Sequence, residues 1–99
     1  MKPRYAKKVD ENQNQIVKAL RKIPGVSVEL DHDDILVGHQ GRTYWFELKK
    51  PDAVSKKTGQ VRESEKKDSQ KRLEKEYNGH YRIVWSLDQI LEEIGILVA

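Results

Sequence analysis

The sequence predicts a mixed α/β (α+β) fold, in which helices flank a central mixed β-sheet in the order α-β-β-β-α-β-α. Two observations lead to this expectation. Apolar residues recur at helical spacing in some segments, and in others they alternate or cluster as β-branched and aromatic runs. At 99 residues the chain is long enough for one domain with a modest core, and we assign residues 10–99 to it.

The first elements are an arm, a helix and a strand. Residues 1–9 are basic and lack periodicity, which predicts a loosely ordered arm. Asp10 can cap a helix that ends at Pro24-Gly25. Residues 26–30, reading VSVEL, alternate as a short strand does. The apolar residues of the helix follow one another at helical spacing: Ile16, Val17, Leu20 and Ile23.

Residues 33–49 are predicted to form a β-hairpin, because two β-branched and aromatic runs flank the segment Gly38-His39-Gln40-Gly41. If the turn is centred between His39 and Gln40, or one residue later as in a pairing of Val37 with Tyr44, Asp34 falls opposite Glu47. Opposed carboxylates repel each other by about 0.2–1 kcal/mol, so a divalent metal ion is expected between them. Alternation puts Trp45, Glu47 and Lys49 on this face, and Tyr44, Phe46 and Leu48 on an apolar one.

The second half of the chain contains a loop, two helices and a strand. Residues 51–64 are basic and rich in turn-forming residues, which predicts a mobile loop able to close over a substrate. A helix over residues 65–77 has sparse apolar anchors, and Asn78-Gly79 ends it. Residues 81–85 form a strand, and Ser86 caps a last helix. That helix carries its apolar residues at Leu87, Ile90, Leu91 and Ile94.

Composition narrows the possible settings of the protein. The chain has no cysteine, which excludes disulfides and thiolate zinc sites and makes a reducing, cytoplasmic compartment the expectation. No apolar run is long enough to cross a bilayer and no signal peptide is present, so no membrane partner is expected. The formal net charge is +3, with basic flanks around an acidic centre. This distribution suits a polyanion held near metal-binding carboxylates.

An acid at the start of a strand, followed by a turn and by Glu47-Leu48-Lys49, resembles the PD-(D/E)xK nuclease superfamily. The whole arrangement is similar to its VRR-NUC branch, in the stand-alone form of phages and bacteria. The similarity covers residues 10–94. It implies a restriction-endonuclease-like core and an intracellular nuclease, located in the host cytoplasm if a phage encodes it. Asp33 stands where the family has proline, so either Asp33 or Asp34 is the ligand, and the face argument favours Asp34.

The resemblance also implies roles for single residues. Mg²⁺ or Mn²⁺ would be bound by Glu11, Asp34, Glu47 and the backbone carbonyl of Leu48, since hard oxygen atoms suit these ions. Lys49 would hold the attacking water or stabilise the transition-state charge. Gln70, on the second long helix, would orient water or phosphate. No small-molecule cofactor is expected.

A basic cluster beside the active strand is expected to contact DNA phosphates. The resemblance implies that a domain of this size acts on branched DNA such as Holliday junctions or flaps, and cutting paired strands would require a homodimer. A nuclease-like module that binds nucleic acid without cutting it, and an RNA nuclease, are the alternatives. The cluster consists of Lys50, Lys56, Lys57, Arg62, Lys66 and Lys67.

Each of these residues also has a simpler interpretation. Glu-X-Lys occurs on exposed strands, an acid at position 11 stabilises a helix start regardless of function, and Gln70 fits a surface helix. Trp45 can contact a base or, more in keeping with its size, pack under a helix, and Trp85 is assigned to the core. The histidines match no metal-binding spacing, and we interpret them as structural or incidental: His32, His39 and His80.

Overall fold

A computed structural model of the chain describes residues 11–31 and 34–96. It contains a four-stranded mixed sheet and three α-helices in the order α-β-β-β-α-β-α, which confirms the predicted fold class and element order. The predicted arm at residues 1–9 lies outside the described residues. Among the described residues, no helix is long and apolar enough to span a membrane.

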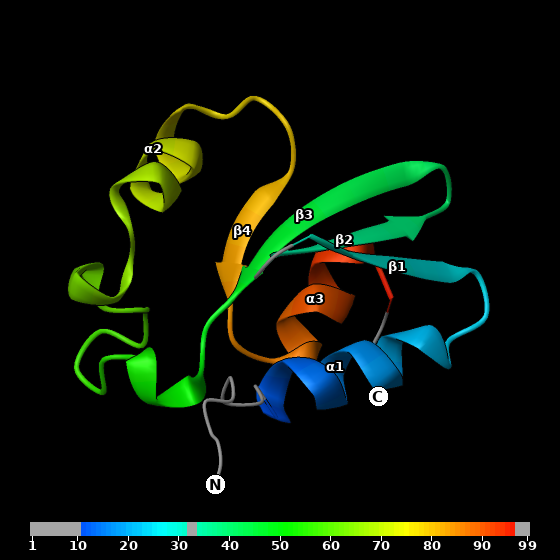
Figure 1. Cartoon of the computed structure of the whole chain (residues 1–99), viewed down its shortest axis with the longest axis horizontal. Coiled ribbons are helices and arrows are strands. Elements are labelled where there is room, and N and C mark those ends of the chain that lie inside the picture. The colour runs from blue at the N-terminus through cyan, green and yellow to red at the C-terminus, as the bar shows by residue number, and fades with distance from the viewer. Residues whose placement is uncertain (1–10, 32–33, 97–99) are drawn as a thin grey trace, which may run out of the picture.

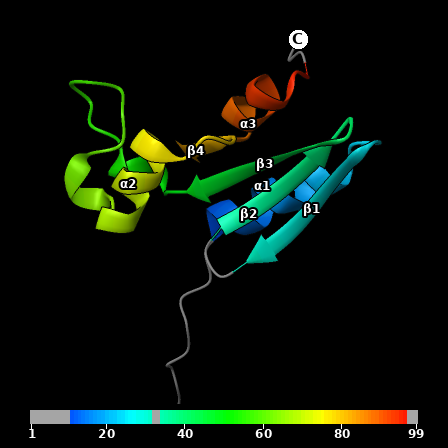
Figure 2. The same cartoon turned by 90° about the horizontal axis from the view of Figure 1, so that it is seen from above.

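The sheet has the order β1-β2-β3-β4 and is built around a central hairpin. Strands β1 (Val26–Asp31), β2 (Asp34–His39) and β3 (Arg42–Leu48) are antiparallel neighbours, and β4 (Tyr81–Val84) runs parallel to β3. Figure 2 shows the three antiparallel strands side by side, with the segment between β3 and β4 extending beyond the end of β3.

The turn between β2 and β3 fixes the register of the hairpin. Gln40 and Gly41 have φ values of 54° and 79°, as a two-residue type I′ turn requires. The turn pairs His39 with Arg42 and, further along, Val37 with Tyr44. The predicted register is therefore confirmed, with the turn centred one residue later than His39-Gln40.

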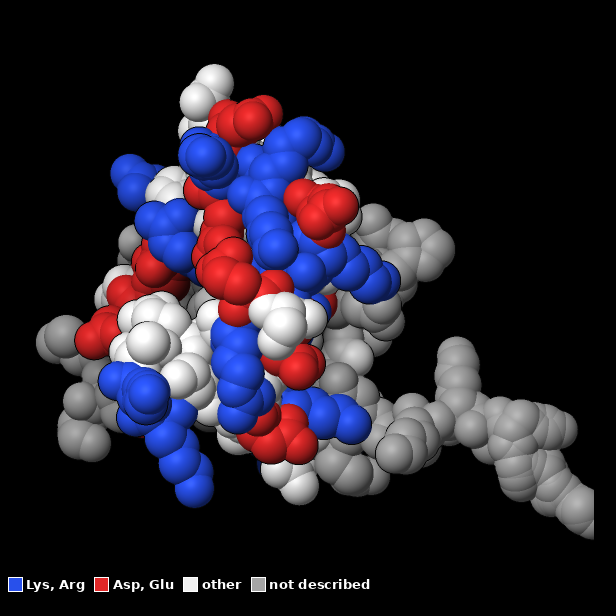
Figure 3. All heavy atoms as spheres, turned by 90° about the vertical axis from the view of Figure 1, so that its left-hand side faces the viewer, with Lys and Arg blue, Asp and Glu red and all other residues white. Residues whose placement is uncertain are grey.

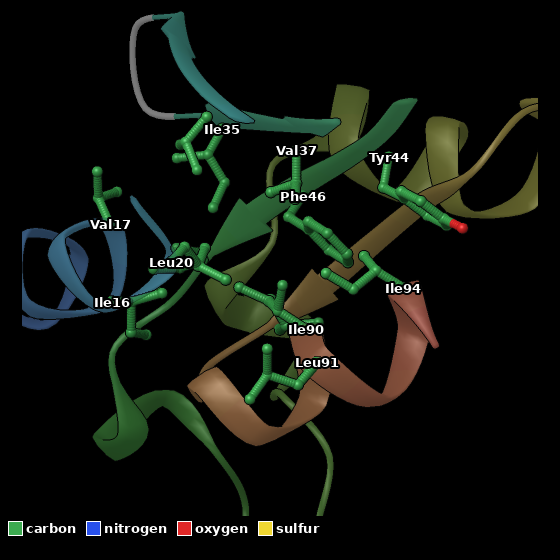
Figure 4. Packing of buried hydrophobic residues seen from close by; sticks show 13 residues of the cluster. Ile16, Val17, Leu20, Ile35, Val37, Tyr44, Phe46, Ile90, Leu91 and Ile94 are labelled. Carbon is green, nitrogen blue, oxygen red and sulfur yellow. The ribbon is translucent and has the colours of Figure 1, made fainter. Parts of the chain in front are cut away.

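One face of the sheet packs against the two helices that begin and end the domain. Helix α1 (Glu11–Arg21) and helix α3 (Leu87–Ile94) lie beneath the strands in Figure 1. Figure 4 shows their apolar side chains meeting those of β2 and β3. Ser86 begins α3 as predicted, with its hydroxyl accepting a hydrogen bond from Gln89 N at 3.3 Å. The most buried side chains of this core are Leu20, Ile35, Val37, Phe46 and Ile90.

The other face carries a second, smaller cluster over β3 and β4. It consists of buried Ala53, Val61, Tyr81 and Ile83, with Trp45, Val54, Leu73 and Trp85 packed against them. Helix α2 (Asp68–Glu76) contributes Leu73 to this cluster. The two faces of β3 therefore pack against different elements. Helices α1 and α3 cover one face, and α2 with its leading segment (residues 51–67) covers the other.

The segment before α2 folds into more local structure than its composition predicts. It forms the 3₁₀ turns η1 (Pro51–Ala53) and η2 (Glu63–Glu65) and a β-bridge between Val54 and Val61. The sequence did not predict these features, because the segment has few apolar residues to anchor it in the second cluster: buried Ala53 and Val61, and partly buried Val54. The predicted start of α2 at residue 65 is wrong by three residues, because Lys66 and Lys67 are extended.

Candidate active site

Asp34 and Glu47 are directly opposed across β2 and β3. Each is an acid on the face of the hairpin that also carries Trp45. Glu47 is 4% exposed, although carboxylates are rarely buried without a partner. The expected juxtaposition of the two acids is therefore present, with Glu47 buried and Asp34 half-buried.

The electrostatics of Glu47 reflect this burial. Desolvation, and then a hydrogen bond and repulsion from Asp34, raise the pKa of Glu47 to about 8, against the opposing effect of Lys49. The Lys49 ammonium lies 3.5 Å from Glu47 Oε2. Without a metal ion, Glu47 therefore keeps its proton at neutral pH. A divalent cation bound between the two acids would displace that proton.

Trp45 holds the second acid of the pair. Its indole Nε1–H donates a hydrogen bond of 2.8 Å to Asp34 Oδ2. The indole makes edge-to-face contacts with Tyr77 and Tyr81, at centroid distances of 5.3 and 5.0 Å. Trp45 therefore packs beneath α2, as its size indicated, and also bonds to the candidate site.

Tyr81 is a buried neighbour of the acid pair. Burial raises the pKa of its hydroxyl above the usual range, and the negative charges of Glu47 and Asp34 raise it further. The phenol therefore remains protonated at physiological pH. It belongs to the wall of the site and is not available as an ionised base.

The Asn12 side chain links α1 to the residues that directly follow β3 and β4. Its side-chain amide donates to the carbonyl oxygens of Lys49 and Trp85, at 3.2 and 3.3 Å. Glu11 precedes Asn12 as the first residue of α1, so its backbone lies near the end of β3. The side chain of Glu11 is not among those described, and Asp33 lies outside the described residues, so their metal-binding roles stay predictions.

Gln70 and Leu48 differ in how they relate to the site. Gln70 is 8% exposed, and its Oε1 accepts a hydrogen bond of 2.9 Å from Lys67 N, capping α2. Among the described residues no hydrogen bond joins it to Asp34, Glu47 or Lys49. The Leu48 side chain is buried in the main core, which leaves its main-chain carbonyl as the group that this residue can offer.

The donor set fits a hard divalent cation. Within residues 11–31 and 34–96, no group of three or more histidine or acidic side chains has metal-binding geometry. The acid pair would supply two ligands, and the Leu48 carbonyl, water and phosphate oxygens could complete an octahedron, which is the usual pattern for Mg²⁺ beside a phosphate substrate.

Most members of the predicted basic cluster are exposed. Lys50, Lys56, Lys57, Arg62 and Lys67 all reach the surface, where Figure 3 shows basic side chains gathered over α2 and its leading segment among interspersed acids.

Lys66 differs, because its side chain is 9% exposed and its ammonium lies 3.0 Å from Glu63 and 2.9 Å from Glu74. Burial alone would lower the pKa of Lys66, but hydrogen bonds to Glu74 and Glu63 raise it overall. Lys66 therefore joins η2 to α2 and has little capacity left for a phosphate.

The described histidines make local contacts. The His39 ring nitrogen Nδ1 lies 3.1 Å from the Ile94 carbonyl oxygen, linking the hairpin to α3. The His80 ring lies 4.8 Å from the Tyr44 ring. His32 lies outside the described residues. The contacts of His39 and His80 are therefore with residues outside the acid pair.

The contacts that three residues make at the site were not predicted from the sequence. Trp45 could have been assigned, because the register places it diagonally across from Asp34 and a buried indole N–H needs an acceptor. Tyr81 could be placed at the site only by knowing that β4 pairs with β3 in parallel, with Tyr81 beside Trp45. No local sequence pattern specifies that pairing. Asn12 gave no signal at all, since its partners are 37 and 73 residues away in the chain.

No family model matches this chain, and searches among curated proteins and solved structures found no match either.

Proposed function

We propose that the protein is a Mg²⁺- or Mn²⁺-dependent nuclease of the VRR-NUC type that hydrolyses phosphodiester bonds in DNA. The observation that carries the proposal is buried Glu47 opposite half-buried Asp34, with the Lys49 ammonium 3.5 Å from Glu47. A fold that kept these three groups only for stability would bear a desolvation cost at Glu47 that Lys49 offsets only in part. A cation-binding site supplies that compensation.

The three residues divide the chemistry between them. Asp34 and Glu47 hold the metal ion with the Leu48 carbonyl, and Glu11 is a further ligand in the same proposal. The ion neutralises phosphoryl charge and activates water when bound. The Lys49 ammonium lies 3.5 Å from Glu47 Oε2, and from there it would donate a hydrogen bond to the attacking water or to a non-bridging phosphoryl oxygen. Gln70 serves the site from α2 by orienting water or phosphate.

The proposal extends to the fold. A three-stranded antiparallel meander followed by a crossover through α2 to a parallel fourth strand is compatible with a restriction-endonuclease-like core. The acid pair lies on β2 and β3, and Lys49 directly follows β3, so the reacting groups come from rigid elements.

DNA would lie across the exposed basic side chains beside β3. Lys50 follows Lys49 directly, and Lys56, Lys57, Arg62 and Lys67 lie on the segment between β3 and α2. Lys66 is left out of this set because Glu63 and Glu74 neutralise it. Branched DNA is the proposed substrate, and a homodimer would provide the two sites that cutting both strands requires.

A substrate panel tests the activity. Linear, flapped and four-way DNA and matching RNA are incubated with Mg²⁺, Mn²⁺ or chelator. We expect metal-dependent cleavage of DNA that Lys49→Ala abolishes and that Lys18→Ala, which removes an exposed lysine on α1, leaves intact. Cleavage of RNA alone would replace the DNA assignment. Failure to cut any substrate with either metal would contradict the proposal.

A nucleic-acid-binding module without cleavage is the second candidate. It is favoured by Gln70, whose side-chain oxygen is engaged in capping α2. This alternative predicts a salt-dependent DNA affinity that neither metal nor Glu47→Gln changes. The nuclease predicts that metal tightens binding in the unsubstituted protein and not in Glu47→Gln.

A further inference from the structure

We infer that Trp45 is a positioning residue, which orients the Asp34 carboxylate for metal binding through its indole N–H. The inference rests on the proposed function, because it assigns a role around the same metal site. It concerns a residue that makes no contact with substrate or reacting atoms. Its effect would be exerted through Asp34 alone.

The hydrogen bond between the two side chains restricts how Asp34 can turn. Trp45 Nε1 donates to Oδ2 at 2.8 Å, a normal length for an N–H···O hydrogen bond. Asp34 is the first residue of β2 and only half-buried, so neighbouring packing does not fix its side chain. With Oδ2 held by the indole, rotation of the carboxylate is restricted, and Oδ1 would be available to a metal ion.

The indole itself is held in place by two aromatic rings. Tyr77 and Tyr81 meet it edge to face, with interplanar angles of 84° and 81°. Tyr81 is buried at the start of β4, and Tyr77 directly follows α2. The orientation of Asp34 therefore depends on elements far from β2 in the sequence, through one rigid ring.

A simpler interpretation is that the indole packs the second cluster and satisfies its N–H with the nearest acceptor. The two interpretations differ in what they predict for metal binding. Residues that orient metal ligands typically contribute about 10–100-fold to metal affinity. A residue that only packs changes thermal stability and leaves metal affinity alone.

The test compares Trp45→Phe with Trp85→Phe, which removes the other tryptophan of the chain. Mn²⁺ binding is measured by calorimetry, and DNA cleavage is measured across a series of Mn²⁺ concentrations. We expect Trp45→Phe to raise the Mn²⁺ dissociation constant about 10-fold or more, while the cleavage rate at saturating Mn²⁺ stays within a few-fold of normal. Trp85→Phe should bind Mn²⁺ as the unsubstituted protein does.

A second measurement leaves the Trp45 side chain in place. The indole N–H proton of Trp45 is followed by NMR as Mg²⁺ is added, with the Trp85 indole as internal reference and Trp85→Phe giving the assignment. We expect the Trp45 signal to shift and saturate at the Mg²⁺ affinity found by calorimetry. A Trp45 signal that does not respond to bound Mg²⁺ would overturn the inference.

The outcomes separate this inference from the proposed function. Equal Mn²⁺ affinity in Trp45→Phe and the unsubstituted protein would overturn the role of Trp45 alone and leave the nuclease proposal standing. Absence of Mn²⁺ binding in the unsubstituted protein would overturn both.

Discussion

At the scale of single residues, Glu47 is the most informative position in the chain. Its side chain is an acid, it is buried in β3, and it lies opposite a second acid, Asp34. Lys49 offsets only part of the resulting cost, since the pKa of Glu47 still rises to about 8. Such a combination is typical of sites that bind a cation or move a proton.

The stability of the metal-free protein should fall as pH rises between 4.5 and about 8. In that range the folded protein binds more protons at Glu47 than the unfolded chain does, so the free energy of unfolding decreases with pH. Each pKa unit is equivalent to about 1.4 kcal/mol. Denaturant unfolding at several pH values, with chelator present, measures the slope.

The matched variants for this prediction are Glu47→Gln and Glu29→Gln. Glu29 is an exposed acid on β1, so its substitution should leave the slope unchanged. Glu47→Gln should flatten the slope. An unchanged slope in Glu47→Gln would show that another group causes the dependence.

Lys49→Ala should lower the cleavage rate about 10²–10⁴-fold at saturating Mn²⁺, the usual contribution of a group that handles the proton or charge of the transition state. Its effect on Mn²⁺ affinity should be small, because the ammonium is not a ligand. Single-turnover kinetics with a calorimetric titration separate the two. A loss confined to Mn²⁺ affinity would contradict the role given to Lys49.

At the scale of elements, the hairpin turn decides whether the acids meet at all. A shift of one residue in the register would send Glu47 to the opposite face. The turn depends on positive φ at Gln40 and Gly41. The register is therefore a consequence of backbone geometry at two residues that are themselves distant from the site.

Gly41→Ala should destabilise the protein by about 1 kcal/mol or more, because a Cβ is strained at φ +79° although no atom lies within 4 Å of it. Gln40→Gly, at φ 54°, should cost less or stabilise, since glycine adopts this conformation without strain. Chemical denaturation measures both. Equal effects of the two substitutions would mean that the turn does not set the stability of the hairpin.

Helix α1 is tied to the site through one side chain. Asn12→Ala should cost about 1 kcal/mol of stability, since it removes two hydrogen bonds to main-chain carbonyls at the ends of β3 and β4. If Glu11 is a metal ligand, the same change should also weaken Mn²⁺ binding by loosening the start of α1. Thermal unfolding in chelator and calorimetry with Mn²⁺ measure the two effects. Asn14→Ala, at an exposed position of the same helix, is the control.

At the scale of the whole molecule, most of the architecture was predictable from periodicity and turn residues. Helices, strands and the register that pairs Asp34 with Glu47 followed from local patterns. The 51–67 segment did not, because long-range packing of Ala53 and Val61 and the pairing of Lys66 with two acids determine its structure. The sequence alone therefore predicted the acid pair and placed Trp45 on its face, but it could not identify Tyr81 or Asn12 as supports, because their partners are distant in the chain.

The surface of the molecule over α2 and the segment before it is not uniformly positive. Basic side chains gather over α2 and its leading segment, with acids among them (Figure 3). The acid pair itself repels phosphate unless a cation is bound. DNA affinity should therefore depend on divalent metal as well as on ionic strength.

The most direct test of the account is single-turnover cleavage of a branched DNA by the unsubstituted protein, Glu47→Gln and Glu29→Gln, in Mn²⁺ and in chelator. We expect cleavage in Mn²⁺ by the unsubstituted protein and Glu29→Gln, none by Glu47→Gln, and none in chelator. Cleavage by Glu47→Gln at the unsubstituted rate, or in chelator, would contradict the proposal that Asp34 and Glu47 form a metal-dependent active site.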